Sequence, residues 1–251
     1  MQTALRDWAA RSGWRSYLSE STAPLYSLVL FIPCLMFYEF AWRRYGGDIV
    51  RNGADVWLDR LLQDAGVVSG RWLPLVTLCG LLAWHYLSRR PWRLKGRVVA
   101  GMMIESSLYA VVLFLLASAA WSMLHRAEGA LGHPVAATGD PVSPSHIRWM
   151  FYCGAGVYEE VLFRAVLLPL LLTVLIRVAR PRAAMLLAVA FTSLLFALVH
   201  YQPVNPYGEL FDWYSFWFRS AAGAAFSLVF LSRGIGIAAL THVGYDILTI
   251  Y

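Results

Sequence analysis

Residues 157–172 read VYEEVLFRAVLLPLLL, and this stretch places two adjacent carboxylates and an arginine at the head of a long apolar run. On a helix, Glu160 and Arg164 stand four residues apart on one face and can form an ion pair. Glu159 is turned by about 100° from Glu160 and is free to face another group. Ionisable residues are costly inside a lipid bilayer, where they mark functional sites. The stretch therefore predicts a membrane helix that carries such a site.

The composition of the whole chain is that of a membrane protein. Of its 251 residues, 59% are hydrophobic, 15% aromatic and only 14% charged, which is typical of polytopic membrane proteins rather than soluble domains. A bilayer core of about 30 Å needs roughly 20 mostly apolar residues per helix. We therefore predict an all-α fold, a polytopic membrane helix bundle with about seven transmembrane helices, in a single domain over residues 1–251. The expected spans are 24–42, 72–88, 98–124, 149–176, 183–200, 211–232 and 235–251.

Two segments outside these spans are predicted to lie at the membrane surface. Residues 1–23 carry arginines but lack the apolar core of a signal peptide, which indicates an interfacial N-terminal segment. Residues 51–66 place apolar side chains at helical spacing, with Asn52 or Asp55 available as the N-cap. This pattern is typical of an amphipathic helix in the interface.

The net charge of +6 is concentrated in loops, especially in RRPWRLKGR at 89–97. It therefore predicts no nucleic-acid partner. Positive loops favour the cytoplasmic side of a membrane. With the N-terminus inside, the inner segments hold 12 Lys and Arg residues and the outer segments hold 7. We expect an integral protein of a bacterial inner membrane with a cytoplasmic N-terminus, and the lipid bilayer is its first partner.

Two further pairs of polar residues lie on expected membrane helices. Phe196 and His200 stand four residues apart in the fifth span, and His242 and Asp246 stand four apart in the seventh. The head of the fourth span and the tail of the fifth lie on the same side of the membrane. The seventh span runs parallel to the fifth if the sixth crosses. A shared site between helices 4, 5 and 7 is therefore predicted.

Three other ionisable residues lie within apolar stretches. These are Glu39, Glu105 and Arg219. Intramembrane charges face the interior of a bundle and pair with one another. We expect the two glutamates to line the cavity or to pair with Arg219.

The predicted cluster supports hydrolytic chemistry. A carboxylate and a neutral imidazole that converge on one water can remove its proton and make it a nucleophile. A second polar pair can stabilise the developing oxyanion. Glu159, His200, His242 and Asp246 would then hydrolyse an amide inside the membrane without a cofactor. The same four residues could instead ligate zinc, since two histidines and a carboxylate form a catalytic zinc set, although the HExxH motif is absent.

Three motifs, in order on successive expected helices, resemble those of a known family. They are Glu159-Glu160-x-x-x-Arg164, Phe196-x-x-x-His200 and His242-x-x-x-Asp246. The family is the CPBP family of intramembrane proteases, which includes CAAX-type prenyl endopeptidases and the bacteriocin-processing or immunity (Abi-like) proteins. The resemblance covers roughly residues 145–251. It implies an intramembrane endopeptidase of the glutamic type.

The resemblance also implies a role for each motif. Glu159 and His200 would activate the water. Glu160 and Arg164 would form a structural pair, and Phe196 would pack beside the histidine.

The third motif departs from the pattern of the CAAX-processing branch. By resemblance, His242 and the residue at position 246 would form the oxyanion site, and that branch has asparagine at this position. Asparagine can donate a hydrogen bond to an oxyanion, whereas ionised aspartate can only accept one. Asp246 must therefore be protonated, or orient His242 from behind, or ligate a metal.

Two classes of function remain open. The first is an endopeptidase that cleaves a membrane-associated protein or peptide. The second is a non-catalytic membrane protein, such as an immunity factor or a scaffold. With the N-terminus inside, the catalytic layer lies in the extracytoplasmic half of the membrane, so the expected substrates are exported or membrane-anchored proteins.

Overall fold

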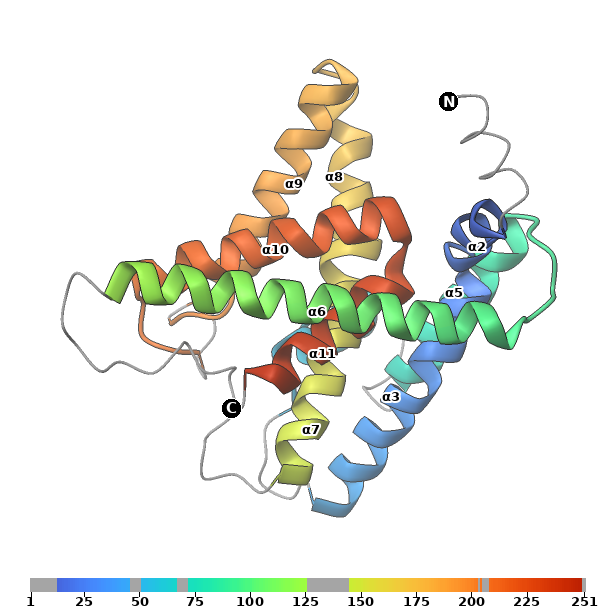
Figure 1. Ribbon diagram of the computed structural model, residues 1–251, viewed down its shortest axis with the longest axis horizontal. Coiled ribbons are helices and arrows are strands. Elements are labelled where there is room, and N and C mark those ends of the chain that lie inside the picture. The colour runs from blue at the N-terminus through green and yellow to red at the C-terminus, as the bar shows by residue number, and fades with distance from the viewer. Residues whose placement is uncertain are drawn as a thin grey trace.

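The chain folds into a set of packed helices (Figure 1). The computed structural model describes residues 13–45, 51–66, 72–125, 145–202, 204 and 208–249. Residues 1–12 of the predicted interfacial segment lie outside the described residues. Within those described, β structure is limited to one isolated bridge between Tyr201 and Glu209, so the predicted all-α fold is confirmed. The helices are α2 (Trp14–Ser21), α3 (Pro24–Tyr45), α4 (Gly53–Asp64), α5 (Leu73–Leu87), α6 (Gly96–His125), α7 (Ser145–Gly154), η2 (Ala155–Glu159), η3 (Val161–Leu167), α8 (Leu168–Leu175), α9 (Pro181–Leu198), α10 (Trp213–Arg233) and α11 (Ile235–Leu248).

Helices occupy all seven expected spans, but they differ in length. In the described part of the chain, three helices are long and apolar enough to cross a membrane: Pro24–Tyr45, Gly96–Ala120 and Pro181–Leu198. The apolar helices α5 and α11 have 15 and 14 residues, which at 1.5 Å per residue is roughly 21–23 Å. These two helices are shorter than the core of a bilayer. The fold is therefore a helical membrane bundle with three full-length spans by this criterion.

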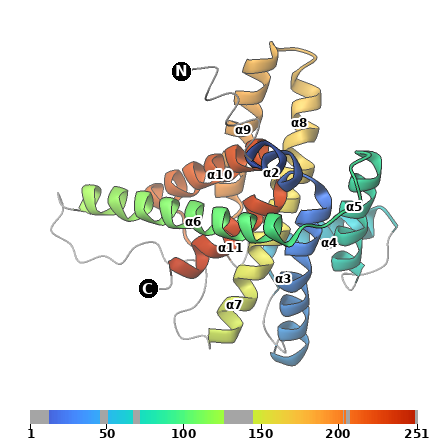
Figure 2. The ribbon, with the colours of Figure 1, turned by 45° about the vertical axis from the view of Figure 1, so that its right-hand side comes forward.

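The longest helix, α6, lies across the molecule (Figure 1), and α11 packs along it. Helix α10 packs on both α9 and α11. A single residue, Gly234, joins α10 to α11, and its φ of 83° is a conformation that side chains disfavour. This sharp link returns the chain inward, and both views place α11 centrally, between α6 and α7 (Figures 1 and 2). The C-terminal motif is thereby carried to the centre of the bundle.

The helix that carries the opening stretch runs from Ser145 to Leu175 and widens at its middle. The π-helical turns η2 and η3 flank Glu160, and α-helix resumes at Leu168. Pro169 follows, and since proline has no N–H, it cannot donate a hydrogen bond to the preceding turn. Wide turns of this kind are frequent at functional sites. The sequence predicted the helix but not the change of pitch.

The turn η2 lies very close to α11. A Cβ atom placed on Gly156 would lie 2.3 Å from Cγ2 of Val243 and 2.9 Å from the carbonyl oxygen of Ala239. Real Cβ contacts are essentially never that short. Glycine at position 156 therefore permits the approach that brings Glu159 next to His242.

The three other intramembrane charges do not pair as predicted. Arg219 donates to Glu209 at 2.8 Å rather than to Glu39 or Glu105. The prediction of a pair with Arg219 is wrong because Glu39 and Glu105 each pair with another arginine. The observed pairs are Arg51–Glu39, Arg233–Glu105 and Arg219–Glu209.

Candidate active site

The three motif-bearing segments meet at Glu159. Its Oε2 atom lies 3.9 Å from Nε2 of His200, which follows the end of α9, and 3.9 Å from Nε2 of His242 on α11. Asp246, one turn after His242, lies 3.7 Å from the same imidazole nitrogen. The structure therefore brings together all four residues that the sequence singled out, as expected for a site between helices 4, 5 and 7.

His200 is oriented by the last turn of the helix before it. Its Nδ1 atom lies 2.7 Å from the carbonyl oxygen of Phe196. Because a carbonyl can only accept, Nδ1 carries the proton and donates it. In the neutral ring, the unprotonated Nε2 then faces Glu159. The ring of Phe196 packs edge-on against His200, with centroids 5.0 Å apart, so the predicted packing is confirmed.

A buried chain of charges orients His242. Its Nδ1 donates to Oε1 of Glu160 at 2.8 Å, and Nη1 of Arg164 lies 3.0 Å from the same oxygen. Glu160 is 0% exposed and Arg164 is 1% exposed. Arg164 also donates to the carbonyl of Gly223 at 3.1 Å and lies over the ring of Phe196. The predicted ion pair is present, and it reaches beyond its own helix to hold the imidazole.

Asp246 does not hold His242 from behind. The position behind the ring, at Nδ1, is occupied by Glu160. The Oδ2 atom of Asp246 instead faces Nε2, the nitrogen that also faces Glu159. The hypothesis that Asp246 orients the ring from behind is therefore wrong, because Glu160 already fills that role. Two carboxylates and two imidazoles thus lie next to one another.

One residue at this site was not predicted. The Nδ2 group of Asn52 donates to Oε1 of Glu159 at 3.0 Å. The Oδ1 atom of the same side chain accepts from the N–H of Ala54 at 2.9 Å and caps α4. Both ends of the amide are thus engaged. The sequence indicated only the N-cap, since the separation of 107 positions from Asn52 to Glu159 leaves no local signal of the contact.

The segment that carries Asn52 is anchored to α3. The hydroxyl of Tyr38 donates to Asp55 at 2.6 Å and accepts from the backbone N–H of Asn52 at 3.2 Å. Arg51 pairs with Asp55 at 2.6 Å and also with Glu39. Burial raises the pKa of Asp55 to about 6, although Arg51 opposes this change. This network fixes the start of α4, which packs against η2, so α4 belongs to the site.

The distances between the carboxylate oxygens and the imidazole nitrogens determine whether a water or a metal ion fits between them. Separations of 3.7 and 3.9 Å are too long for direct hydrogen bonds, whereas one water at about 2.8 Å from two such atoms fits between them. Nitrogen and oxygen ligands of a tetrahedral zinc ion lie roughly 3.4 Å apart. Among the described residues, no group of three or more His, Cys, Asp or Glu side chains is arranged to hold a metal. The spacing therefore leaves room for a water between each pair of atoms.

Comparison with known proteins concerns the C-terminal part of the chain. A family model described as "Type II CAAX prenyl endopeptidase Rce1-like" matches residues 141–248. No curated protein matches the chain, nor does any solved structure. The matched segment contains all three motifs, whereas Asn52 precedes it. The resemblance is therefore confirmed: over residues 141–248 this helical membrane protein is similar to the Rce1-like, CAAX-type endopeptidases, a family of proteases.

Proposed function

We propose that the protein is a glutamic intramembrane endopeptidase, which hydrolyses a peptide bond of a membrane-associated protein or peptide. The observation that carries the proposal is the position of Oε2 of Glu159, 3.9 Å from both His200 Nε2 and His242 Nε2. A water between these atoms contacts a carboxylate base and an imidazole at once. The family match supports peptidase activity in general, and the assignment of mechanism and substrate is our inference.

In the proposed reaction, Glu159 and His200 act on the water. The carboxylate of Glu159 accepts one proton as the water oxygen attacks the carbonyl carbon, which forms a C–O bond and a tetrahedral oxyanion. His200 holds the water by accepting its second hydrogen at Nε2. Glu159 then gives its proton to the amide nitrogen as the C–N bond breaks. The products are a carboxylic acid and an amine, and the carboxylate of Glu159 is restored.

His242 is proposed to bind the oxyanion. A carboxylate faces each of its ring nitrogens, Glu160 at Nδ1 and Asp246 at Nε2. Two such neighbours stabilise the positive charge of an imidazolium. An imidazolium donates a hydrogen bond to an oxyanion and offsets its charge. Asp246 would thus act through His242, in place of the neutral donor that CAAX-processing enzymes carry at this position.

Glu159 is proposed to be positioned by the residues around it. Asn52 holds one carboxylate oxygen at 3.0 Å, which leaves the other oxygen directed at the histidines. The close approach at Gly156 sets the distance from η2 to α11. Preorganised donors and acceptors of this kind lower the cost of reaching the transition state because they need not rearrange during the reaction.

We propose that this reaction needs no bound metal, because the spacing of the site suits water. The second candidate is a metal-dependent version of the same protease, in which Glu159, His200, His242 and Asp246 would hold zinc. Zinc would supply a Lewis acid and a more acidic water. Dialysis of the purified protein against a strong chelator separates the two. We expect cleavage to continue, whereas a loss that zinc alone restores would favour the metal-dependent version.

The proposed substrates are exported or membrane-anchored proteins. The distribution of Lys and Arg favours a cytoplasmic N-terminus. Under that orientation the site lies towards the extracytoplasmic half of the membrane. A peptide bond near a hydrophobic tail could reach this level while the tail stays in the lipid.

The direct test uses purified full-length protein and peptides derived from a membrane-protein extract, with cleavage products identified by mass spectrometry. Glu159→Gln keeps the shape of the side chain and removes the base, so we expect cleavage to fall roughly 10²- to 10⁴-fold. Asp64→Asn changes an exposed carboxyl at the end of α4 and should leave cleavage unchanged. Equal cleavage by the wild type and Glu159→Gln would contradict the proposal. A folded wild type that cleaves nothing would favour the non-catalytic membrane protein.

A further inference from the structure

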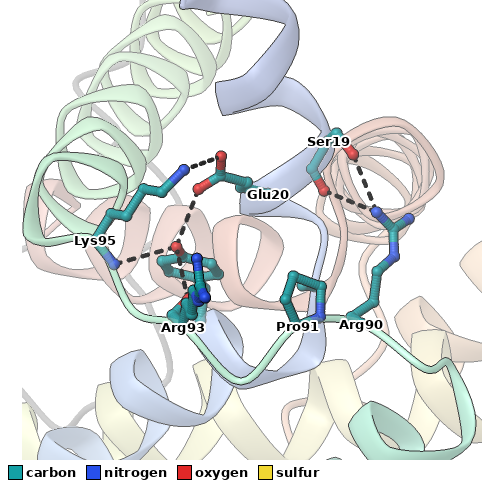
Figure 3. Close-up of a pocket in the computed structure, with 8 residues that line it drawn as sticks. Ser19, Glu20, Arg90, Pro91, Arg93 and Lys95 are labelled. Atoms are coloured by element: carbon teal, nitrogen blue, oxygen red, sulfur yellow. Dashed lines mark hydrogen bonds and ion pairs between the residues drawn. The ribbon is translucent and has the colours of Figure 1, made fainter.

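A cavity outside the candidate active site lies between α2 and the connection from α5 to α6 (Figure 3). Its volume is about 430 Å³. One wall comes from α2, and the facing wall comes from the connection. The residues labelled in the close-up are Ser19, Glu20, Arg90, Pro91, Arg93 and Lys95. The active-site residues do not line this cavity, so it calls for a separate explanation.

The connection presents two different faces. Between the end of α5 and the start of α6, segment 90–95 is not helical. Arg93 and Lys95 line the cavity, whereas the alternate residues Trp92 and Leu94 are 57% and 52% exposed. The cationic side chains thus line the cavity, whereas the apolar row, Trp92 and Leu94, lies outside its lining.

The charge that lines the cavity is positive. Lys95 binds Glu20 at 2.6 Å, and this hydrogen bond lowers the pKa of Glu20. The carboxylate therefore stays ionised and offsets the charge of Lys95. Arg90 donates to the hydroxyl of Ser19 at 3.0 Å, as Figure 3 shows. Among the residues that the structure describes, the guanidinium groups of Arg90 and Arg93 have no carboxylate partner.

Of the two arginines, Arg93 is the more available to bind a ligand. Its guanidinium has no hydrogen-bond or ion-pair partner within the described ranges. Its backbone is nevertheless fixed, since its carbonyl accepts from the hydroxyl of Tyr26 at 3.3 Å. The N–H of Lys95 donates to the same hydroxyl at 3.2 Å. The protein therefore holds the segment in place while it leaves the cationic head of Arg93 for another partner.

The cavity lies beside the ends of two membrane spans. Helix α3 begins at Pro24 and α6 begins at Gly96, and both are long and apolar enough to cross a membrane. The start of a span lies at the level of the lipid headgroups. Exposed tryptophan beside basic residues, as at Trp92, is typical of that level. If α3 and α6 cross the membrane, the cavity lies at the level of the phosphate layer of one leaflet.

We infer that this cavity binds the phosphate headgroup of an anionic phospholipid. The planar guanidinium groups of Arg90 and Arg93 match the geometry of phosphate oxygens. Trp92 and Leu94 then contact the apolar region just below the headgroup. A soluble phosphate would use the same cations but not this apolar row, and for that reason the lipid is favoured over free phosphate.

The experiment measures lipid binding by native mass spectrometry of the full-length protein in neutral detergent. We expect phosphatidylglycerol to bind more tightly than phosphatidylcholine. Arg93→Gln should weaken phosphatidylglycerol binding about fivefold, the effect of one basic residue at an anionic surface. Because the guanidinium of Arg93 has no partner among the described residues, this change should leave the fold intact. Arg177→Gln, an exposed arginine between α8 and α9, is the matched control and should bind as the wild type does.

The inference would be overturned by equal binding of the two lipids, by unchanged binding in Arg93→Gln, or by an equal loss in Arg177→Gln. Displacement of phosphatidylglycerol by millimolar inorganic phosphate would also overturn it, in favour of a free phosphate ligand. Arg90→Gln provides a second variant and should likewise weaken binding about fivefold. The readout is independent of peptidase activity, so its failure would not bear on the proposed function.

Discussion

Replacement of Asn52 by serine separates the two roles of this side chain. Serine caps helices about as well as asparagine, so α4 should keep its first turn. The donor from Nδ2 to Glu159, at 3.0 Å, is lost in the variant. We expect a catalytic defect without a comparable loss of stability.

The size of that defect follows from the contact. A hydrogen bond to a charged group contributes about 1.5–3 kcal/mol. Each 1.36 kcal/mol corresponds to a factor of ten in rate, so kcat should fall roughly 10- to 150-fold. Asn52 contacts the proposed base rather than a remote part of the substrate. For this reason KM should stay within about twofold of the wild-type value.

The assay compares kcat, KM and thermal unfolding for purified variants on one cleaved peptide. Asn52→Ala removes the cap as well as the donor, and should cost about 1 kcal/mol more in stability than Asn52→Ser. Gln63→Ser changes an exposed residue later in α4 and should match the wild type. A wild-type kcat in Asn52→Ser would refute a positioning role. So would activity losses that simply follow the unfolding temperature in every variant.

Three further predictions concern the bundle itself. Glu160→Gln leaves Arg164 buried without its carboxylate, which should cost about 3–5 kcal/mol; a variant that unfolds at the wild-type temperature in detergent would contradict this. Gly156→Ala should cost about 1–3 kcal/mol through its clash with α11, whereas Gly80→Ala, with open space around it, should be neutral or slightly stabilising. The same loss in both glycine variants would show that packing against α11 is not the cause. A reporter fused after Tyr251 should be extracytoplasmic, and cytoplasmic activity would reverse the proposed side of the site.

Much of the bundle could be predicted from the sequence because membrane helices are recognised by their long apolar stretches. Long apolar runs have no alternative in lipid but a helix, so every expected span contains one. The meeting of the three motifs also followed, since Glu159 lies towards the head of its span and His200 at the tail of its span, while Asp246, one turn after His242, lies towards the far end of the last span. Topology alone puts those ends on one side of the membrane.

The remaining contacts depend on tertiary packing, which the spacing of residues in the sequence does not reveal. Asn52 reaches Glu159 because Tyr38 and Arg51 fix the start of α4, and these partners are set by tertiary structure. The wide turns around Glu160 depend on local hydrogen bonding. The contact from Glu160 to His242 could not be predicted either, because sequence spacing on its own helix pointed only to Arg164.

The central claim is that Glu159 activates a water to cleave a membrane-associated protein. Its most direct test compares the protein termini in membranes of cells that carry either the wild type or Glu159→Gln, with both proteins inserted at equal levels. The account predicts new termini in the wild-type membranes that vanish in the variant, and their sequences would name the substrate and the side of cleavage. Identical termini in the two samples would contradict the account and assign the buried cluster a structural role.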